Sequence, residues 1–220
     1  MLAVGFLVAN TGTANAYCAI FRPDDGKHYW DGDTQTPGNG ISGVSSDIWN
    51  YNPWVGSNFD DTLDYVMLQA SGGWWAQIGR RSQFNFVELT FWQWTTAPNQ
   101  WLNKNIAGQP ESTFSNYKVN YNSSSNSFVF WLNGVNQGSV AAAFHPTYMS
   151  VAGEIQTLAS QMPGAAEDTE SNWNQTYRDF NNLWHAASPI KMSIVNSTYF
   201  SYALISPGDV DIYDKACPLS

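Results

Sequence analysis

Charged side chains are scarce in this sequence. Only 12% of its 220 residues are charged, and 9 Lys and Arg stand against 18 Asp and Glu, so the formal net charge is −9. The only adjacent basic residues are Arg80 and Arg81. Nucleic acids and anionic membranes are bound through clustered positive charge. The composition therefore argues against both as partners.

The residues that usually bind metals are also few. The chain has three histidines, His28, His145 and His185, which are far apart, and it contains neither H-E-x-x-H nor C-x-x-C. Zinc sites and redox motifs need such closely spaced ligands. A G-x-S-x-G nucleophile elbow is absent as well. We therefore expect no metal and no cofactor, and the motifs do not favour a serine hydrolase.

Cysteine occurs only twice, as Cys18 and Cys217. In an oxidising compartment the two thiols could form a disulfide that joins the ends of the mature chain. Closing so long a loop stabilises a fold by roughly 4–5 kcal/mol at most. The alternative is a pair of free thiols, which is less common in secreted proteins.

Long apolar runs are missing except at the start of the chain. Residues 2–9 are apolar, and Ala14-Asn15-Ala16 fits the cleavage rule of a secretory signal peptide, although the usual basic segment before it is absent. An N-terminal β-strand is the alternative. We expect a signal peptide over residues 1–16, a secreted, extracellular protein, and one monomeric domain over residues 17–220.

Aromatic and turn-forming residues are what the chain has in quantity. Aromatics make up 15% of it, and short runs of β-forming residues alternate with Gly, Asn, Ser and Pro, as in an all-β protein. The strands that we expect are 17–21, 64–70, 74–79, 84–94, 117–121, 128–132, 149–157, 190–195, 199–205 and 210–213. So many short strands predict an antiparallel β-sandwich or jelly roll with long loops.

Three segments resist assignment to strands. Residues 22–43 and 95–113 are rich in Gly, Pro, Asp and Asn and are expected to be loops, and residues 172–187 suit either a short helix or an aromatic-lined loop. The first loop contains G-x-G-x-x-G at 38–43, but without a strand before it and a helix after it this does not indicate a dinucleotide site. Asp31-Gly32-Asp33 in the same loop offers oxygen ligands for Ca²⁺, although a solvated acidic loop is the simpler interpretation.

The segment from Trp74 to Trp94 is expected to form two central strands. On the second strand, Glu88, Thr90, Trp92 and Trp94 share one face, because side chains alternate along a strand. Both faces carry large apolar groups, so the strand is expected to be covered on both sides. Gln77 and Glu88 are then polar groups among aromatic rings, and each needs a hydrogen-bond partner or belongs to a site.

Two of the five glutamates, Glu88 and Glu154, lie in apolar strand-like stretches. Burial raises the pKa of a carboxyl group, which suits general acid–base catalysis. Two facing glutamates on a jelly roll would also suit a glycosidase. The alternative for each residue alone is a structural carboxylate that accepts backbone or Trp N–H bonds.

Four motifs occur in an order that resembles the secreted glutamic peptidases: W-x-Q-x-G at 75–79, F-V-E-L-T-F-W at 86–92, G-E-I at 153–155 and Q-M-P-G at 161–164. The glutamine of the first motif is similar to the eqolisin family, and the last two motifs are similar to the neprosin family. The resemblance implies a concanavalin A-like jelly roll. Arg80 and Ala152 depart from the neprosin pattern, in which Trp and Gly are usual.

The resemblance further implies that Gln77 and Glu154 hydrolyse a peptide bond at acidic pH. Glu154 would activate a water, and the Gln77 amide would donate to the oxyanion. We expect Trp75, Glu88 and Trp92 to contact the polypeptide substrate. A second hypothesis is a lectin-like module that binds a glycan without catalysis, and a third is a glycosidase that uses Glu88 and Glu154.

Overall fold

The computed structural model describes residues 27–51, 53–56, 60–85, 87–98, 100–163, 172–187, 192–194 and 198–215. The expected signal peptide, the expected strand at 17–21 and both cysteines lie outside these residues. In the part of the chain that is described, no helix is long and apolar enough to cross a membrane.

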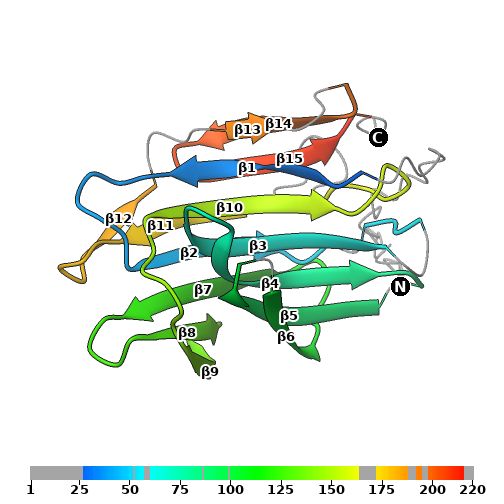
Figure 1. The fold of residues 1–220 in the computed structure, drawn as a ribbon. Coiled ribbons are helices and arrows are strands. Elements are labelled where there is room, and N and C mark those ends of the chain that lie inside the picture. The colour runs from blue at the N-terminus through cyan, green and yellow to red at the C-terminus, as the bar shows by residue number, and fades with distance from the viewer. Residues whose placement is uncertain are drawn as a thin grey trace, which may run out of the picture.

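Within the described residues, fifteen strands form two sheets, which Figure 1 shows as two stacked layers. The seven-stranded sheet has the order β13 (Met192–Ile194), β1 (Tyr29–Gln35), β10 (Tyr148–Ile155), β3 (Asp61–Ala70), β4 (Trp74–Gln83), β5 (Val87–Ala97) and β6 (Gln100–Ala107). The eight-stranded sheet has the order β14 (Phe200–Ser206), β15 (Asp209–Asp214), β11 (Asn172–Arg178), β2 (Gly43–Trp49), β7 (Phe114–Asn122), β8 (Ser127–Leu132) and β9 (Val135–Ala141), and β12 (Trp184–Ala186) pairs with β11.

The predicted antiparallel sandwich is confirmed. Neighbouring strands within both sheets run antiparallel, as in the pairings of β3 with β4 and of β2 with β7. The main apolar core lies between the sheets and consists of residues that alternate inward. Its members include Val66 and Ile78 from one sheet and Val119 and Phe130 from the other. Burial of such side chains is the main driving force for closing the sandwich.

Both segments that were expected to be loops contain a strand. Residues 22–43 contain β1, whose inward positions include Asp31 and Asp33, so the apolar alternation that marks a strand is missing. Residues 95–113 contain β6, an edge strand that is exposed over most of its length and therefore needs no apolar face. The burial of Asp31 and Asp33 in β1 also corrects the interpretation of this segment as a solvated acidic loop.

The structure settles three smaller questions. Residues 172–187 form β11, a turn and β12 rather than a helix. The G-x-G-x-x-G sequence connects β1 to β2, which confirms that it does not open a helix. The second central strand starts at Val87 and not at Phe84, because Phe84 and Asn85 form a turn in which Asn85 has a φ of 65°.

Candidate active site

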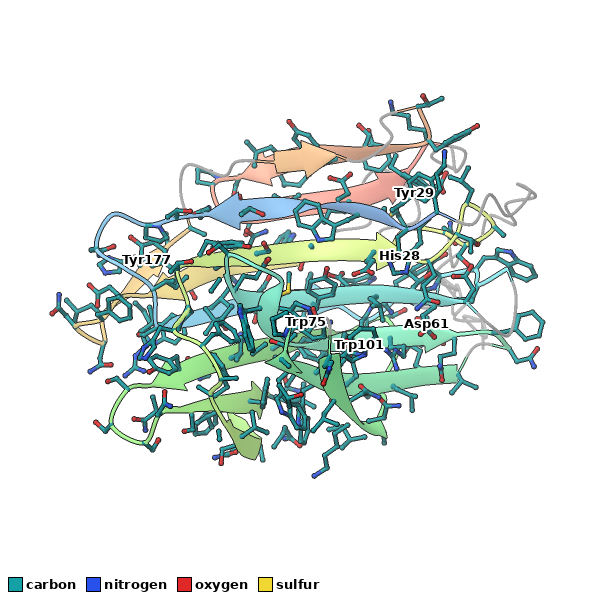
Figure 2. All side chains as sticks on the ribbon, viewed as in Figure 1. His28, Tyr29, Asp61, Trp75, Trp101 and Tyr177 are labelled. Atoms are coloured by element: carbon teal, nitrogen blue, oxygen red, sulfur yellow. The ribbon has the colours of Figure 1, made fainter. Side chains whose placement is uncertain are left out.

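A cavity of about 520 Å³ is hollowed into the outer face of the seven-stranded sheet. It is lined by side chains from β1, β3, β4, β5, β6, β10 and the segments next to them: His28, Trp30, Thr34, Leu63, Tyr65, Met67, Gln69, Trp75, Gln77, Arg81, Gln93, Trp101, Ser150, Glu154 and Gln156. Figure 2 shows His28, Trp75 and Trp101 over this sheet. Gln77 and Glu154, both singled out from the sequence, therefore lie in one cavity.

The floor of the cavity is shaped by glycine opposite a large aromatic ring. Gly79 pairs with Tyr65, and a Cβ atom on Gly79 would lie 2.6 Å from the Cβ of Tyr65. On the next strands, a Cβ on Gly32 would lie 2.5 Å from that of Ala152. Real Cβ atoms do not come this close to one another, so only glycine fits at either position. The glycine of the W-x-Q-x-G motif is thus required by the packing of Tyr65.

Glu154 lies at one end of this floor and is held by two neighbours. The Tyr65 hydroxyl donates to Glu154 Oε2 at 3.0 Å, and His28 Nδ1 lies 3.4 Å from Glu154 Oε1. The Glu154 side chain is 20% exposed, so it keeps access to the cavity. Burial raises its pKa above the ordinary 4.5, and His28, Tyr65 and Arg81 oppose this shift while Asp61 adds to it.

Tyr65 joins Glu154 to the apolar part of the floor. Its ring packs with Leu63, Met67 and Phe91 in a cluster on the outer face of the sheet. Burial and the nearby Glu154 carboxylate raise the pKa of Tyr65 well above its ordinary value, so the hydroxyl keeps its proton and remains a donor. The carboxylate is therefore oriented by a neutral, buried phenol.

Gln77 lies at the other end of the floor in a row of polar side chains. Its Nε2 donates to Gln93 Oε1 at 2.8 Å, and only 5% of the residue is exposed. An amide NH₂ carries two protons, so one further hydrogen bond remains available. The row continues on β10 with Ser150, whose Oγ accepts from Gln69 Nε2 at 2.6 Å.

Gln77 and Glu154 share the cavity without being neighbours. Gln77 pairs with Met67 and Met67 with Ser150, whereas Glu154 lies four residues further along β10. With usual strand spacings, two strands and four residues separate the backbones of Gln77 and Glu154 by about 17 Å. Tyr65 occupies the row between them. A direct hydrogen bond between the two side chains is excluded, and any joint action needs a substrate between them.

Trp75 lines the cavity, together with an aromatic partner that sequence reasoning missed. The ring centroids of Trp75 and Trp101 are 6.2 Å apart, and Figure 2 shows the two residues side by side. Trp101 lies on β6, within the stretch expected to be a loop, and it is 57% exposed. Trp30 and His28 were missed for the same reason, since they lie within the other expected loop. Their aromatic character in polar segments was the only available signal.

Trp92 does not fit its predicted role in substrate binding. It is 3% exposed and stacks on Phe130 of the opposite sheet, with 5.7 Å between ring centroids. Its face of β5 points into the core, because the other sheet covers that side. The sequence predicted which residues share a face with Trp92, but not which face lines the cavity.

Glu88 does not fit a substrate-binding role either. Leu89 is aligned with Arg81 on β4, which is aligned with Leu63 on β3, the partner of Glu154. Glu88 is adjacent to Leu89 in the chain and so points to the opposite side of the sheet. There its Oε1 lies 2.6 Å from Arg80 Nη1 within the sandwich. A glycosidase that uses Glu88 and Glu154 across one groove does not fit this arrangement.

No group of three or more His, Cys, Asp or Glu residues that could hold a metal ion occurs among the residues that the structure describes. Among the residues that line the cavity, Glu154 alone carries a carboxyl group.

Comparisons with protein-family models and with curated protein sequences gave no match. Solved structures do match. SCP-B, a member of the eqolisin family of peptidases in complex with the tripeptide Ala-Ile-His, aligns with a TM-score of 0.64 at 10% identity, over 87% of this chain and 100% of that chain. Scytalido-glutamic peptidase with a transition-state analogue inhibitor aligns with a TM-score of 0.62 at 11% identity over the same shares.

The same peptidase with a peptide-based transition-state analogue aligns with a TM-score of 0.57 at 9% identity, again over 87% of this chain and 100% of that chain. Identities this low establish the fold alone. The chain therefore has the jelly-roll fold of the glutamic peptidases, as the order of its motifs predicted.

Proposed function

We propose that this protein is a peptide hydrolase in which Glu154 acts on a polypeptide bound in the cavity of the seven-stranded sheet. The observation that carries the proposal is Glu154 itself. It is a largely buried carboxyl group with a raised pKa that opens into a cavity of about 520 Å³, on a fold shared with glutamic peptidases. Perturbed carboxyl groups in clefts are typical of catalytic sites.

The chemistry needs one group that first accepts and then donates a proton. Ionised Glu154 takes a proton from a water molecule as the water oxygen attacks the peptide carbonyl carbon. The carbonyl π electrons move to oxygen, which gives a tetrahedral oxyanion. Protonated Glu154 then donates to the leaving amine as the C–N bond breaks. The Tyr65 hydroxyl keeps the carboxylate oriented during both steps.

Gln77 is the proposed donor to the oxyanion. The proton of its amide that is not used by Gln93 is available for a developing negative charge. Base, water, carbonyl and donor require contacts of about 3 Å each. Because Gln77 and Glu154 lie at different points of the floor, the scissile carbonyl would have to lie between them, over Tyr65.

The aromatic side chains of the cavity suit an extended peptide. Trp75 and Trp101 form a pair at one side, and Trp30 lies on β1 at the other. Large aromatic surfaces bind apolar side chains with modest loss of conformational entropy. The side-chain amides of Gln69, Gln77 and Gln93 can form hydrogen bonds with the peptide backbone, and such bonds do not depend on the sequence of the peptide.

Glu154 must be ionised to act as the base, and this decides the expected pH dependence. Burial raises the pKa of Glu154 above the ordinary 4.5, so the rate is expected to fall as the pH drops through this raised pKa. The charged or titratable groups that face it are His28, Arg81, Asp61 and Tyr65. The proposed activity is therefore expected to be lost toward pH 2–3, where Glu154 is protonated.

The test is cleavage of a denatured protein substrate across pH 2 to 7, with products identified by mass spectrometry. Glu154→Gln keeps the shape of the side chain and is expected to lower kcat/KM by about 10²–10⁴-fold. Glu111→Gln is the matched control, because it removes a carboxylate from an exposed position. Full activity of Glu154→Gln, or no cleavage by the folded wild type at any pH, contradicts the proposal.

A further inference from the structure

A second cavity, of about 500 Å³, lies on the outer face of the eight-stranded sheet. It is on the opposite side of the sandwich from the candidate active site, and the two share no lining residue. Its walls combine two basic side chains, Lys118 and Arg178, with two tryptophans, Trp131 and Trp184. Nothing in the proposed peptidase chemistry uses this site.

The strand registers explain why these residues meet. Arg178 on β11 pairs with Trp184 on β12, and Lys118 on β7 pairs with Trp131 on β8. Between them lies Gly43 on β2, which pairs with both Arg178 and Asn120. All six residues come from regular strands, so the positions of their side chains are set by the sheet and not by a loop.

Gly43 keeps the floor of this cavity open. A Cβ atom at this position would lie 2.6 Å from Asn120 Oδ1 and 3.0 Å from Arg178 Cβ. Any other residue would push these two side chains apart and fill the space between them. The close approach of a basic residue and an amide therefore depends on this glycine.

Two basic side chains lie here, and none of the described carboxylates forms a salt bridge with either. Lys118 Nζ lies 5.1 Å from the centre of the Trp131 ring and 5.9 Å from that of Trp184. Partial burial and the nearby Arg178 both lower the pKa of Lys118. In a chain with a net charge of −9, an uncompensated pair of this kind suits an anionic ligand.

Two polar atoms in the same walls also lack partners. Asn120 Oδ1 and Trp131 Nε1 are both buried and make no hydrogen bond within the part of the chain that is described. A buried polar atom without a hydrogen-bond partner is unfavourable. One acceptor and one donor beside an open cavity can be satisfied by ligand hydroxyl groups, which both donate and accept.

We propose that this cavity binds an acidic oligosaccharide, a short chain of hexuronic acid units. The apolar face of a sugar ring fits against an indole ring, as Trp184 offers with 42% of its surface exposed. Sugar hydroxyls pair with Asn120 and the Trp131 N–H, and the uronate carboxylate pairs with Lys118 and Arg178. The site would let the protein bind a polysaccharide separately from the polypeptide in the proposed active site.

Calorimetric titration with trigalacturonate tests the proposal, and the fully methyl-esterified trisaccharide is the uncharged control. The protein is to be made without N-glycosylation, because Asn122, in an N-S-S sequence, lines the cavity. Trigalacturonate is expected to bind at least tenfold more tightly than its ester. No measurable binding, or equal affinity for both, overturns the proposal.

Variants locate the binding. Lys118→Met is expected to weaken binding of trigalacturonate at least tenfold. Lys104→Met is the matched control, because Lys104 Nζ also lies over a tryptophan ring, 4.8 Å from the centre of Trp92, but outside the cavity. Trp184→Ala removes an exposed ring and serves if Lys118→Met fails to fold. Unchanged affinity in the folded Lys118→Met variant, or in Trp184→Ala, overturns the assignment to this cavity.

Two further titrations separate this ligand class from others. A triglutamate peptide and a trinucleotide carry similar charge without a uronic acid ring, and both are expected to bind at least tenfold more weakly. Equal affinity for either one overturns the saccharide assignment. Trp75→Ala is expected to leave trigalacturonate binding unchanged, because Trp75 lies in the other cavity. The outcome does not depend on whether the protein cleaves peptides.

Discussion

At the scale of single residues, the contact between Tyr65 and Glu154 is central to the candidate active site. The phenol donates to the carboxylate at 3.0 Å and comes from β3, whereas the carboxylate comes from β10. A hydrogen bond to the ionised form lowers the pKa of a carboxyl group, and here it opposes the effect of burial. Together with burial and the nearby His28, Tyr65 thus helps to set the pH at which Glu154 becomes a base.

Tyr65→Phe removes this donor and leaves the ring. The pKa of Glu154 is expected to rise further, because its ionised form loses a hydrogen bond while the burial stays. The acidic limb of the pH–rate profile then moves to higher pH, and NMR titration of the Glu154 carboxyl carbon gives the same shift without substrate. An unchanged or lower pKa in the folded variant would show that the phenol does not stabilise the carboxylate.

Gln77→Ala removes the proposed oxyanion donor. By analogy with other donors of this kind, kcat is expected to fall by about 10²–10³-fold, with a smaller effect on KM, since the oxyanion exists only in the transition state. The control is Gln109→Ala, which removes a side-chain amide outside the cavity. Equal kinetics of Gln77→Ala and the wild type would rule out the role of Gln77.

At the scale of the strands, the pairing of β3 with β4 determines the shape of the active-site floor. Gly79 lies directly opposite Tyr65, and the two backbones leave no room for a side chain at the glycine. The W-x-Q-x-G motif can therefore be understood as one strand: Trp75 and Gln77 point into the cavity, and Gly79, two residues on, makes space for the aromatic ring of the neighbour.

Gly79→Ala is expected to destabilise the fold by about 1–3 kcal/mol, since the added methyl group would overlap Tyr65 and force the strands apart. Gly38→Ala is the control, because a Cβ there meets nothing within 4 Å, and its effect is expected to stay within about 0.5 kcal/mol. Urea unfolding of both variants measures the difference. Equal stability of the two would mean that the floor adapts without cost.

At the scale of the whole molecule, the sandwich buries acidic side chains between its sheets. Asp31 and Asp64 both pair with Gly153 and so lie in one inward-facing row on either side of it. Burial raises the pKa of each to about 7, and for Asp64 the nearby Arg80 opposes the shift. For Asp31 the backbone N–H of Gly32 opposes the shift.

Because of these buried acids, we expect the folded protein to be more stable near pH 4 than near pH 7. When the folded pKa of an acid exceeds the unfolded value, the folded state holds more protons between the two values, and stability falls as the pH rises. For Asp31 the window runs from the ordinary 3.8 to about 7. A difference of roughly 3 pKa units corresponds to about 4 kcal/mol as an upper limit.

Asp31→Asn tests this window, because the amide has nearly the same shape and does not ionise. The variant is expected to match the wild type near pH 4 and to exceed it in the free energy of unfolding at pH 7. Urea unfolding at both pH values measures the effect, and Glu111→Gln provides an exposed control. If wild type and Asp31→Asn lose stability equally between pH 4 and pH 7, Asp31 is not the source.

The sequence by itself determined the fold class and the local pattern. Alternation along Trp74–Trp94 identified the central strands and the residues that share a face, and the order of the motifs predicted the glutamic-peptidase fold. Strands with buried acids, such as β1, or with no buried face, such as β6, were missed. Their residues lack the apolar period from which strands are recognised.

Only the tertiary structure decided which face of each strand meets the other sheet. The alternation of side chains along a strand shows which residues share a face, but not whether that face is turned inward or outward. Trp92 and Glu88 were therefore expected in the substrate groove, although the second sheet covers their face. The tertiary structure also places Tyr65 in contact with Glu154, which is 89 residues away in the sequence. Strand pairing sets such contacts, and it depends on the register of the whole sheet rather than on any local stretch of sequence.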